Sequence, residues 1–314
     1  MSTPSRAPVV ALDVGGTAMK GAVLDSLTEV RELRRWRTLR DRGPDAVVEQ
    51  TLTAVDELVS AAPDARAVGL VVPGVVDEDA GVAVHSENIE WHAVEFRRLV
   101  AERTGLPVGF GHDVRAGGLA EHELGAGRGC DDVLFMPIGT GISGAMFVAG
   151  RLVHSPYAGE MGHVHAGFDD PCACGARGCL EAVASGASIA RRYRRLGGGT
   201  VPGAREVLEL VDAGDLAAAT AWRDALDALA RVLVTYISIL APQRILVGGG
   251  VSHAGERLLG PLRDRVRAGL VWQREPELVR AALGDEAGCL GAGLVARQAL
   301  VHSAPPDVIS TQGR

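Results

Sequence analysis

Two stretches of the chain, far apart in the sequence, share one pattern: an apolar strand, a glycine-rich turn and a second strand. They are VVALDVGGTAMKGAVLD (9–25) and DVLFMPIGTGISGAMFVAGRLV (132–153). In each, a short apolar run of the kind that forms a buried strand stops at glycines that permit a tight turn. The second half of the chain therefore echoes the first, and the pattern predicts an internal repeat of two related domains.

Strands alternate with helices along the rest of the chain. We expect strands over 67–74 and 106–113, and a strand followed by a glycine turn over 244–252. Helices are expected over 44–62, 94–104, 114–124, 221–241 and 288–301. This alternation is typical of an α/β protein with parallel or mixed sheets. Since ligands often bind between domains, we expect a site in a central cleft between the two halves.

Two other kinds of segment are interpreted without a function. The basic run RRYRR (191–195) is interpreted as a solvated helix face. The terminal segments 1–8 and 303–314 are expected to be loose.

Composition excludes several classes of protein. Of the 314 residues, 47% are hydrophobic and 23% charged, which is typical of a globular protein large enough for two domains. The net charge of −7 is opposite to that of proteins that bind nucleic-acid backbones, and no apolar run is long enough to span a membrane. Five cysteines, three of them clustered, make no disulfide framework here. We expect a cytoplasmic protein without nucleic-acid or membrane partners.

Three glycine-rich turns follow strands, at 13–21, 138–144 and 247–252. Glycine lets the backbone approach a phosphate group and direct N–H groups at it, and nearby hydroxyl and ammonium groups can add to the binding. The candidate nucleotide-binding residues are Gly15, Gly16, Thr17 and Lys20, then Gly139, Thr140 and Gly141, then Gly248, Gly249 and Gly250. Tight hairpins alone would also explain each turn. Their recurrence in both halves favours a nucleotide held between two domains.

Two aspartates stand at the ends of predicted strands. Asp13 lies beside the first glycine turn, where a carboxylate can hold a hydrated Mg²⁺ that bridges to phosphate oxygens. The alternative for Asp13 is a residue that caps the turn. Asp113 ends the strand over 106–113, where it could act as a general base and take the proton of an attacking hydroxyl. The alternative for Asp113 is the N-cap of the next helix.

A metal site is predicted in the stretch GEMGHVHAGFDDPCACGARGCLE (159–181). Cys172, Cys174 and Cys179 supply three thiolates on a tight loop, and His163 or His165 could complete a tetrahedral set suited to Zn²⁺. Three reduced cysteines without a metal are the alternative. Glu160 and Glu181 flank the loop, and ionised carboxylates accept hydrogen bonds from a ligand rich in hydroxyl groups, such as a sugar. The stretch therefore predicts a structural metal whose flanks contact substrate.

These motifs resemble those of the bacterial ROK family of sugar kinases and related repressors, and the resemblance covers nearly the whole chain. Its most specific part is GEMGHVHAGFDDPCACGARGCLEAVASG (159–186), which is similar to the family's sugar-binding E-x-x-H, zinc-binding CxCGxxGC and E-x-x-A-S-G segments. DVGGT, GTGISG and GGGV resemble the phosphate and adenosine segments of the actin–hexokinase ATPase superfamily. The resemblance implies two ribonuclease-H-like domains, with the last helix returning to the first.

The resemblance also implies roles for single residues. By position, Asp113 matches the catalytic base, and Glu160, His163 and Glu181 match sugar contacts. The implied zinc ligands are His163, Cys172, Cys174 and Cys179, so His163 would use its two ring nitrogens for two tasks. Gly74 and Asn88 lie where the family's sugar cleft is lined. His112 stands where the family usually has an asparagine that contacts sugar hydroxyls, which leaves the identity of the sugar open.

The implied activity is ATP-dependent phosphorylation of a hexose at its primary hydroxyl, with Mg²⁺, and glucose is the leading substrate. The alternatives are fructose, N-acetylmannosamine or N-acetylglucosamine, or a sugar sensor without catalysis. We expect an N-terminal domain over 1–115 that includes the last helix, 288–302, and a larger domain over 116–287 with the zinc loop 163–179. About eight residues before the first strand argue against a DNA-binding repressor. By analogy with the family, a homodimer or homotetramer is expected.

Overall fold

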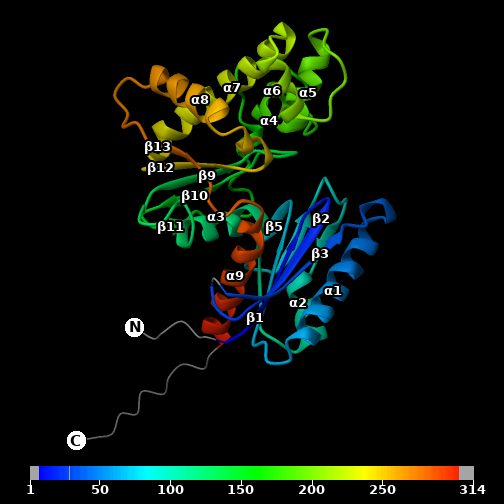
Figure 1. The fold of residues 1–314 in the computed structure, drawn as a ribbon. Coiled ribbons are helices and arrows are strands. Elements are labelled where there is room, and N and C mark those ends of the chain that lie inside the picture. Colours follow the sequence, from blue (N-terminus) through cyan, green and yellow to red (C-terminus); the bar gives the residue numbers. More distant parts are fainter. Residues whose placement is uncertain (1–6, 28, 304–314) are drawn as a thin grey trace, which may run out of the picture. The chain divides into compact units, whose positions relative to one another are not determined.

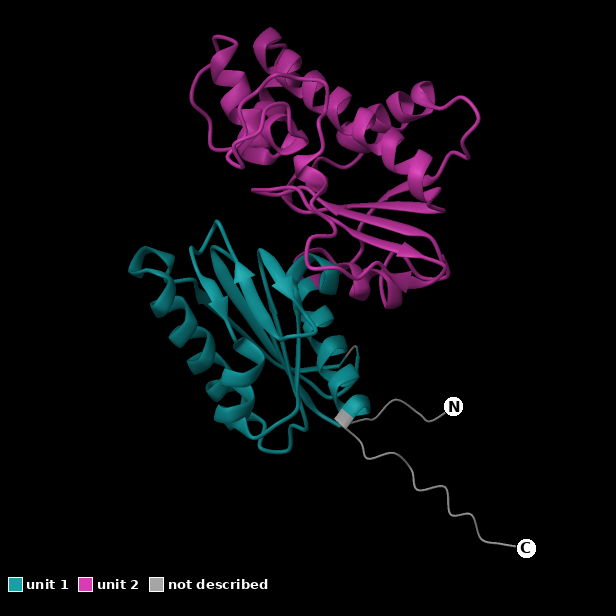
Figure 2. Ribbon diagram, turned by 180° about the vertical axis from the view of Figure 1, so that it is seen from behind, with its two compact units in different colours: residues 1–117, 288–314 teal, residues 118–287 magenta. Residues whose placement is uncertain are grey.

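The computed structural model describes residues 7–27 and 29–303, and the terminal segments expected to be loose lie outside these ranges except for residues 7, 8 and 303. The chain forms two compact units, coloured teal and magenta in Figure 2. The first comprises residues 1–117 and 288–314, and the second comprises residues 118–287.

The first unit contains a mixed five-stranded sheet in the order β3-β2-β1-β4-β8. Its strands are β1 (Val9–Val14), β2 (Ala18–Leu24), β3 (Val30–Arg37), β4 (Val68–Val72) and β8 (Val108–His112). The pairs β1–β2 and β2–β3 are antiparallel, while β1–β4 and β4–β8 are parallel. Because β1, β4 and β8 run the same way, Asp13 and His112 both stand toward the carboxyl edge of the sheet.

Helices cover both faces of this sheet (Figure 1). Helices α1 (Pro44–Ala61) and α2 (Phe96–Thr104) share one hydrophobic core with it. Helix α9 (Ala287–Ser303) and the start of α3 (Asp113–Glu123) share the other. The two faces thus bury the apolar side chains that alternate along the central strands.

Helix α9 packs unusually close to the sheet because two glycines face it. Gly69 of β4 and Gly109 of β8 are paired across the sheet. A Cβ atom at Gly69 would lie 1.8 Å from the carbonyl oxygen of Ala292, and one at Gly109 would lie 2.2 Å from that of Val295. Any larger residue would push the helix away, so these glycines fix where the C-terminal helix returns to the first unit.

A second, small antiparallel sheet lies in the first unit, made of β5 (Val75–Asp77), β6 (Val82–His85) and β7 (His92–Val94). Ile89 and Trp91, in the loop between β6 and β7, are 2% and 1% exposed and join the core on the α1–α2 side. These two apolar anchors hold the loop that also carries Asn88.

The second unit repeats the sheet of the first. Its strands are β9 (Val133–Pro137), β10 (Ala145–Val148), β11 (Arg151–Leu152), β12 (Arg244–Gly248) and β13 (Glu277–Arg280). Their order is β11-β10-β9-β12-β13, with the same sequence of antiparallel and parallel pairs. The predicted internal repeat and the α/β class with mixed sheets are confirmed.

A layer of helices packs on one face of this second sheet and shares its core. These helices are α4 (Leu180–Ala184), α5 (Gly186–Arg195), α6 (Ala204–Asp212), α7 (Leu216–Leu240) and α8 (Glu256–Gly269). On the opposite side, the ring of His122 in α3 stacks on Phe147 of β10. In the described ranges, no helix has the length and apolar character needed to cross a membrane.

The structure adds elements that the sequence analysis did not name. Strand β3, VRELRRWR, has an exposed face and a partly buried one, so its charges hide the pattern of an edge strand. Helix α6 follows a glycine- and proline-rich loop and was not expected. Helix α7 begins earlier than predicted, at Leu216, because the Asp215 side chain accepts a hydrogen bond from the Ala218 N–H and caps it.

The interpretation of residues 191–195 as a solvated face is wrong for Arg192. Its guanidinium donates to Asp170 Oδ2 at 2.9 Å and to Asp224 Oδ2 at 2.8 Å, and it lies over the ring of Phe168. Arg195 also pairs with Asp170. The side chains are recruited because the loop around Asp170 docks on helix α5, and its buried carboxylate requires positive partners.

Candidate functional site

The first glycine turn joins β1 to β2. The Gly15 N–H donates to the Ala18 carbonyl at 3.0 Å, and the Thr38 hydroxyl donates to the Gly15 carbonyl at 2.6 Å. A Cβ atom at Gly16 would lie 3.6 Å from Cβ of Asn88, so the exposed Asn88 stands beside the turn. Thr17 is exposed. The turn is therefore held from behind while its tip remains accessible.

Asp13 has an unusual electrostatic environment at the end of β1. Burial and, to a smaller extent, the charge of Asp113 raise the pKa of its carboxyl to about 7, against an opposing effect of Lys20. Lys20 is its cross-strand partner on β2. A Cβ atom at Gly288 would lie 2.3 Å from Asp13 Oδ2, so helix α9 begins against this carboxylate. Two neighbouring carboxylates in a partly buried place are suited to a divalent cation.

His112 and Asp113 stand where β8 ends and α3 begins. His112 is 6% exposed, and its Nδ1 accepts hydrogen bonds from the N–H groups of Val114 at 3.2 Å and Arg115 at 3.3 Å. His112, not Asp113, is thus the N-cap of the helix. Since a protonated imidazole has no lone pair to accept these bonds, they require a neutral ring with its proton on Nε2.

The Asp113 carboxylate stays partly exposed beside this cap. Its Oδ1 accepts from the Val114 N–H at 2.7 Å and lies 3.4 Å from His112 Nδ1. The alternative that Asp113 caps the helix is therefore not what the structure shows. As the first residue of α3, its carboxylate also benefits from the positive end of the helix dipole.

A buried ion pair that the sequence analysis missed supports this corner. Arg115 is 2% exposed, and its Nε donates to Glu78 Oε1 at 2.8 Å. The same carboxylate oxygen accepts from the His112 backbone N–H at 3.0 Å. Glu78 thereby ties the small sheet's hairpin to the end of β8. The sequence analysis singled out His112, but nothing in the sequence around it indicated the pair Glu78–Arg115.

Gly74 lies under the end of β6. Its φ angle is +99°, and a Cβ atom there would come within 2.2 Å of the His85 carbonyl oxygen. Only glycine tolerates both the angle and the contact. Gly74 therefore sets the path of the hairpin whose loop carries Asn88.

In the second unit, the second and third glycine turns lie against each other. The Ile138 N–H donates to the Gly248 carbonyl at 2.9 Å, and the Val251 N–H donates to the Ile138 carbonyl at 3.0 Å. Gly249 has a φ of +72°, and a Cβ atom there would come within 2.5 Å of the Ile138 oxygen. The structure thus brings together two of the three turns that the sequence singled out.

Glu181 and Glu160 both approach the second glycine turn. Glu181 Oε2 accepts from the Ile142 N–H at 2.8 Å, and a Cβ atom at Gly141 would lie 2.7 Å from the same oxygen. Glu160 follows Gly159, whose carbonyl accepts from the Gly144 N–H at 2.8 Å. Burial and the negative charge of Glu160 raise the pKa of Tyr236, a neighbour on α7 that the sequence analysis did not name.

The four predicted metal ligands converge. One ligand atom each from His163, Cys172, Cys174 and Cys179 lie within 4.8 Å of one another. His163 Nδ1 is 3.8 Å from Cys172 Sγ, and Cys174 Sγ is 3.7 Å from Cys179 Sγ. Ligands about 2.0–2.3 Å from a tetrahedral zinc are separated by about 3.5–3.8 Å. The donor set therefore fits Zn²⁺, and it would leave no position for a catalytic water.

His163 is the histidine of this cluster. Its Nε2 lies 3.9 Å from Glu160 Oε2, on the other side of the ring from the thiols. His165 is turned elsewhere, since its Nδ1 accepts from the Gly167 N–H at 3.2 Å. The ring of His163 therefore connects the metal cluster with the carboxylate of Glu160.

The thiols of the cluster differ in acidity. Burial, together with the neighbouring Cys172 and Cys174, raises the pKa of the Cys179 thiol to about 12. A hydrogen bond from the backbone of Ala176 lowers the pKa of Cys174. A metal would have to displace the proton of Cys179, because the thiolate is the ligand.

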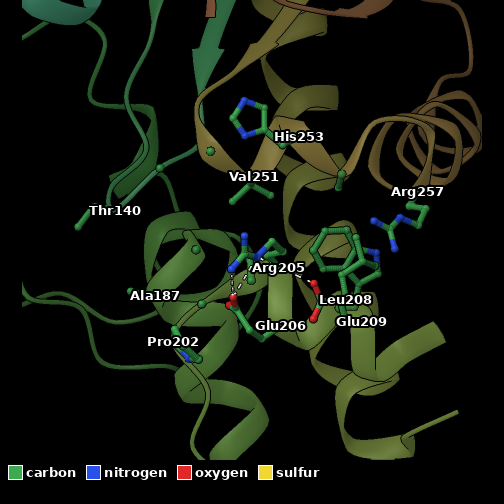
Figure 3. A pocket seen from close by; sticks show the side chains of 17 residues that line it. Thr140, Ala187, Pro202, Arg205, Glu206, Leu208, Glu209, Val251, His253 and Arg257 are labelled. Atoms are coloured by element: carbon green, nitrogen blue, oxygen red, sulfur yellow. Dashed lines mark hydrogen bonds and ion pairs between the residues drawn. The ribbon is translucent and has the colours of Figure 1, made fainter. Parts of the chain in front are cut away.

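A cavity of about 670 Å³ opens beside the two glycine turns of the second unit (Figure 3). Gly139, Thr140 and Gly250 line it. Helix α6, with Arg205, Glu206 and Glu209, forms another wall, and Arg257 of α8 and the preceding His253 line the cavity as well. The volume is within the range of sites for nucleotide-sized ligands.

The wall residues of this cavity were missed because helix α6 was missed. Ala204, Val207 and Leu208 of α6 are buried, a helical spacing that could have revealed it. Gly186 also lines the cavity, and its N–H donates to the Gly139 carbonyl at 2.9 Å. The site residues predicted from the sequence fall into two groups, one in each unit.

The metal cluster yields a direct prediction. Cys174→Ala should remove one of four ligands and abolish stoichiometric zinc, because the remaining three no longer close the tetrahedron. Wild-type chain purified without chelator should hold one zinc, measured by elemental analysis. Cys130→Ala, outside the cluster, is the control and should keep its zinc. Wild-type protein free of zinc would refute the assignment.

The raised pKa of Asp13 predicts a pH-dependent stability. Its pKa is about 7 in the folded chain and about 3.8 when unfolded, so stability declines as pH rises through that interval. Asp13→Asn should therefore gain about 1–3 kcal/mol over wild type at pH 8 and less at pH 5. Urea unfolding without added Mg²⁺ measures this. Asp79 is exposed, so the control variant Asp79→Asn should differ from wild type by the same free energy of unfolding at both pH values. The same behaviour in Asp13→Asn would contradict the proposed effect of Asp13.

Comparison with known proteins identifies the lineage of this site. The family model "ROK family" matches residues 9–299. The chain is 32% identical to a glucokinase of Thermotoga maritima, over 92% of this chain and 97% of that protein. It is 30% identical to an N-acetylmannosamine kinase of Citrobacter koseri, over 92% and 98%.

A solved structure gives the same result for the fold. A ROK family glucokinase from Streptomyces griseus, in complex with glucose and AMPPNP, superposes with a TM-score of 0.80. It is 29% identical and covers 93% of this chain and 99% of its own. The two sheets are thus those of the two-domain actin–hexokinase ATPase fold, and the chain belongs to the ROK family.

Proposed function

We propose that this chain is a sugar kinase that transfers the γ-phosphoryl group of ATP to the primary hydroxyl of a hexose, with glucose as the leading substrate. The observation that carries the proposal is the position of the second glycine turn. One side of it borders the 670 Å³ cavity, and the carboxylate of Glu181 contacts its backbone N–H. A nucleotide and a polyol could therefore be bound on either side of one turn.

The nucleotide is assigned to the cavity of the second unit. Backbone N–H groups of the turns at Gly139–Gly141 and Gly248–Gly250 would face its phosphates, where glycine allows close approach. In the first unit, the turn Gly15–Thr17 and Lys20 provide further donors and a positive charge. Mg²⁺, when bound, would neutralise developing charge on the phosphates, and Asp13 is the residue proposed to hold it through water.

The side chains proposed to bind the sugar are hydrogen-bonding groups from each of the two units. Glu160 and Glu181 are acceptors when ionised, and Asn88 offers both donors and an acceptor. His163 would donate from Nε2, since its Nδ1 faces the thiols. Zinc in this proposal is structural: it fixes the loop between Glu160 and Glu181 and takes no part in the chemistry.

Asp113 is proposed as the general base. Its carboxylate accepts the proton of the primary hydroxyl while the hydroxyl oxygen forms a bond to the γ-phosphorus and the bond to the β-phosphate oxygen breaks. The buried pair Glu78–Arg115 and the cap by His112 hold the backbone on both sides of Asp113. They act as positioning groups, because orientation of the base is part of its rate effect.

His112 distinguishes this chain within the proposal. Because Nδ1 accepts hydrogen bonds from two backbone N–H groups, Nε2–H is the one donor of the neutral ring. An asparagine would offer two donors and an acceptor. A site that hydrogen-bonds hydroxyls rejects analogues that leave its polar groups unpaired. We therefore infer that His112 changes which hydroxyl pattern fits best, toward a weaker use of glucose or toward another hexose or an N-acetylhexosamine.

The test of the proposed function is a coupled assay of the full chain with a panel of hexoses and N-acetylhexosamines. ATP and polyphosphate are supplied separately as phosphoryl donors. Turnover of one sugar with ATP supports the kinase. A protein that binds a sugar but turns over none with either donor would be a sensor, and the proposal would fail.

Replacement of Asp113 tests directly whether it is the general base. Asp113→Asn keeps the shape, and its amide oxygen can still accept from the Val114 N–H. We expect kcat to fall by roughly 10²–10⁴-fold, the usual contribution of a general base, with sugar affinity nearly unchanged. Turnover gives kcat, and calorimetry gives sugar affinity. A variant with more than about a tenth of wild-type kcat would place the base elsewhere.

The role of His112 is tested by His112→Asn. Asparagine is a good N-cap, so the helix start and the stability should be kept while the group offered to a sugar changes. We expect the order of kcat/KM across the sugar panel to change. His112→Ala, which lacks a cap, controls for stability and should lose about 1 kcal/mol. An unchanged order in the asparagine variant would show that His112 does not contact the substrate.

A further inference from the structure

A pair of histidines in the small sheet of the first unit has no role in the proposed reaction. His85 at the end of β6 and His92 at the start of β7 are cross-strand partners. Their Nδ1 atoms lie 3.3 Å apart, with ring centroids 4.7 Å apart. Both rings are accessible; the side chain of His85 is 41% exposed.

The tautomer of His85 is set by a neighbouring carboxylate. Its Nε2 lies 3.3 Å from Glu87 Oε2, and a carboxylate can only accept, so the Nε2–H donates. The neutral ring then has its lone pair on Nδ1, directed at the Nδ1 of His92. An imidazole held by a carboxylate through one nitrogen, with the other nitrogen available, is the arrangement that proteins use for metal-ligating histidines.

The separation of the two nitrogens also suits a metal ion. Two nitrogens bound to a tetrahedral Zn²⁺ at about 2.0–2.1 Å lie about 3.3 Å apart. Imidazole ligands favour Zn²⁺, Ni²⁺ and Cu²⁺ over Mg²⁺ or Ca²⁺. With two protein ligands, water or an anion would complete the coordination, which makes the site exchangeable, unlike the cluster of three cysteines and His163.

The backbone around the pair is strained. Among the described residues, non-glycine residues with a left-handed φ include Glu90 at +67° and Ala93 at +50°, on either side of His92. The loop is closed by hydrogen bonds from Ser86 N–H to the Trp91 carbonyl at 3.3 Å and from Glu90 N–H to the Ser86 carbonyl at 2.7 Å. Strain of this kind is typical of segments with a function beyond packing.

We propose that His85 and His92 form a second, exchangeable binding site for a transition-metal ion, with Glu87 orienting His85. The bound ion cross-links the hairpin whose loop carries Asn88. Cross-linking orders that loop before sugar binds, so metal lowers the KM for the sugar. This last effect depends on the proposed function, whereas metal binding does not.

The test is calorimetric titration of the zinc-loaded full chain with Ni²⁺. Wild-type protein should bind one Ni²⁺ that the double variant H85Q/H92Q does not bind. Glu87→Gln should weaken binding by roughly tenfold, as expected for a residue that orients a ligand. His302→Gln, an exposed histidine on α9, is the matched control and should bind like wild type. Circular dichroism verifies that the variants are folded.

Equal Ni²⁺ uptake by wild type and H85Q/H92Q, or no uptake by wild type, would overturn the site; in the second case the two rings share only a proton. In the sugar assay, Ni²⁺ should lower the KM of wild type and leave that of H85Q/H92Q unchanged. An unchanged wild-type KM would overturn the coupling to sugar. Failure of every sugar to react would refute the kinase proposal, while the titration would still decide the metal site.

Discussion

The backbone of residues 138–144 forms hydrogen bonds with four separate segments of the second unit. It contacts the third glycine turn through Ile138, the start of α5 through Gly139, and the segment 159–162 through Ile142 and Gly144. The fourth contact is the Glu181 side chain. Two of these contacts, with segment 159–162 and with Glu181, require glycine, because Cβ atoms at Gly141, Gly159 or Gly162 would collide with the facing atoms. The candidate site of this unit thus depends on one glycine turn.

The equivalent hairpin of the first unit has the same topology but different chemistry. Its turn is bordered by charge: Asp13, Lys20 and Asp113 interact electrostatically, and burial leaves Asp13 with a pKa near neutrality. The raised pKa means that ionisation of this carboxyl group is unfavourable in the folded chain, and a bound cation would remove that penalty. The two units therefore contain similar turns, of which one has acidic groups around its end and the other borders a cavity and the segment that leads into the metal cluster.

Much of this could be predicted from the sequence, and the rest depends on contacts between distant residues. The repeated strands, the last helix and the cysteine cluster have local signatures in apolar spacing and glycine position. Strand β3 and helix α6 were missed because charges or a loop hid their periodicity. The pair Glu78–Arg115, the clamp of Asp170 by Arg192 and the capping by His112 have no such signature. The partners in the two ion pairs are distant in the sequence, and the capping by His112 depends on the geometry of the turn that starts α3, so neither can be read from a local pattern.

The metal loop is held in two independent ways, and this bears on what zinc can do. Between His163 and Cys172, Asp170 is clamped by Arg192 and Arg195 of α5, while Arg192 also pairs with Asp224 of α7. At the C-terminal end of the loop, Cys179 is 1% exposed and Leu180 is fully buried in the core of the unit. Neither anchor needs a metal. Zinc would therefore order the exposed part of the loop, including Cys174 and His163, more than it stabilises the unit. Since His163 Nε2 lies 3.9 Å from Glu160 Oε2, loss of the metal should disturb the proposed sugar contacts before it unfolds the unit.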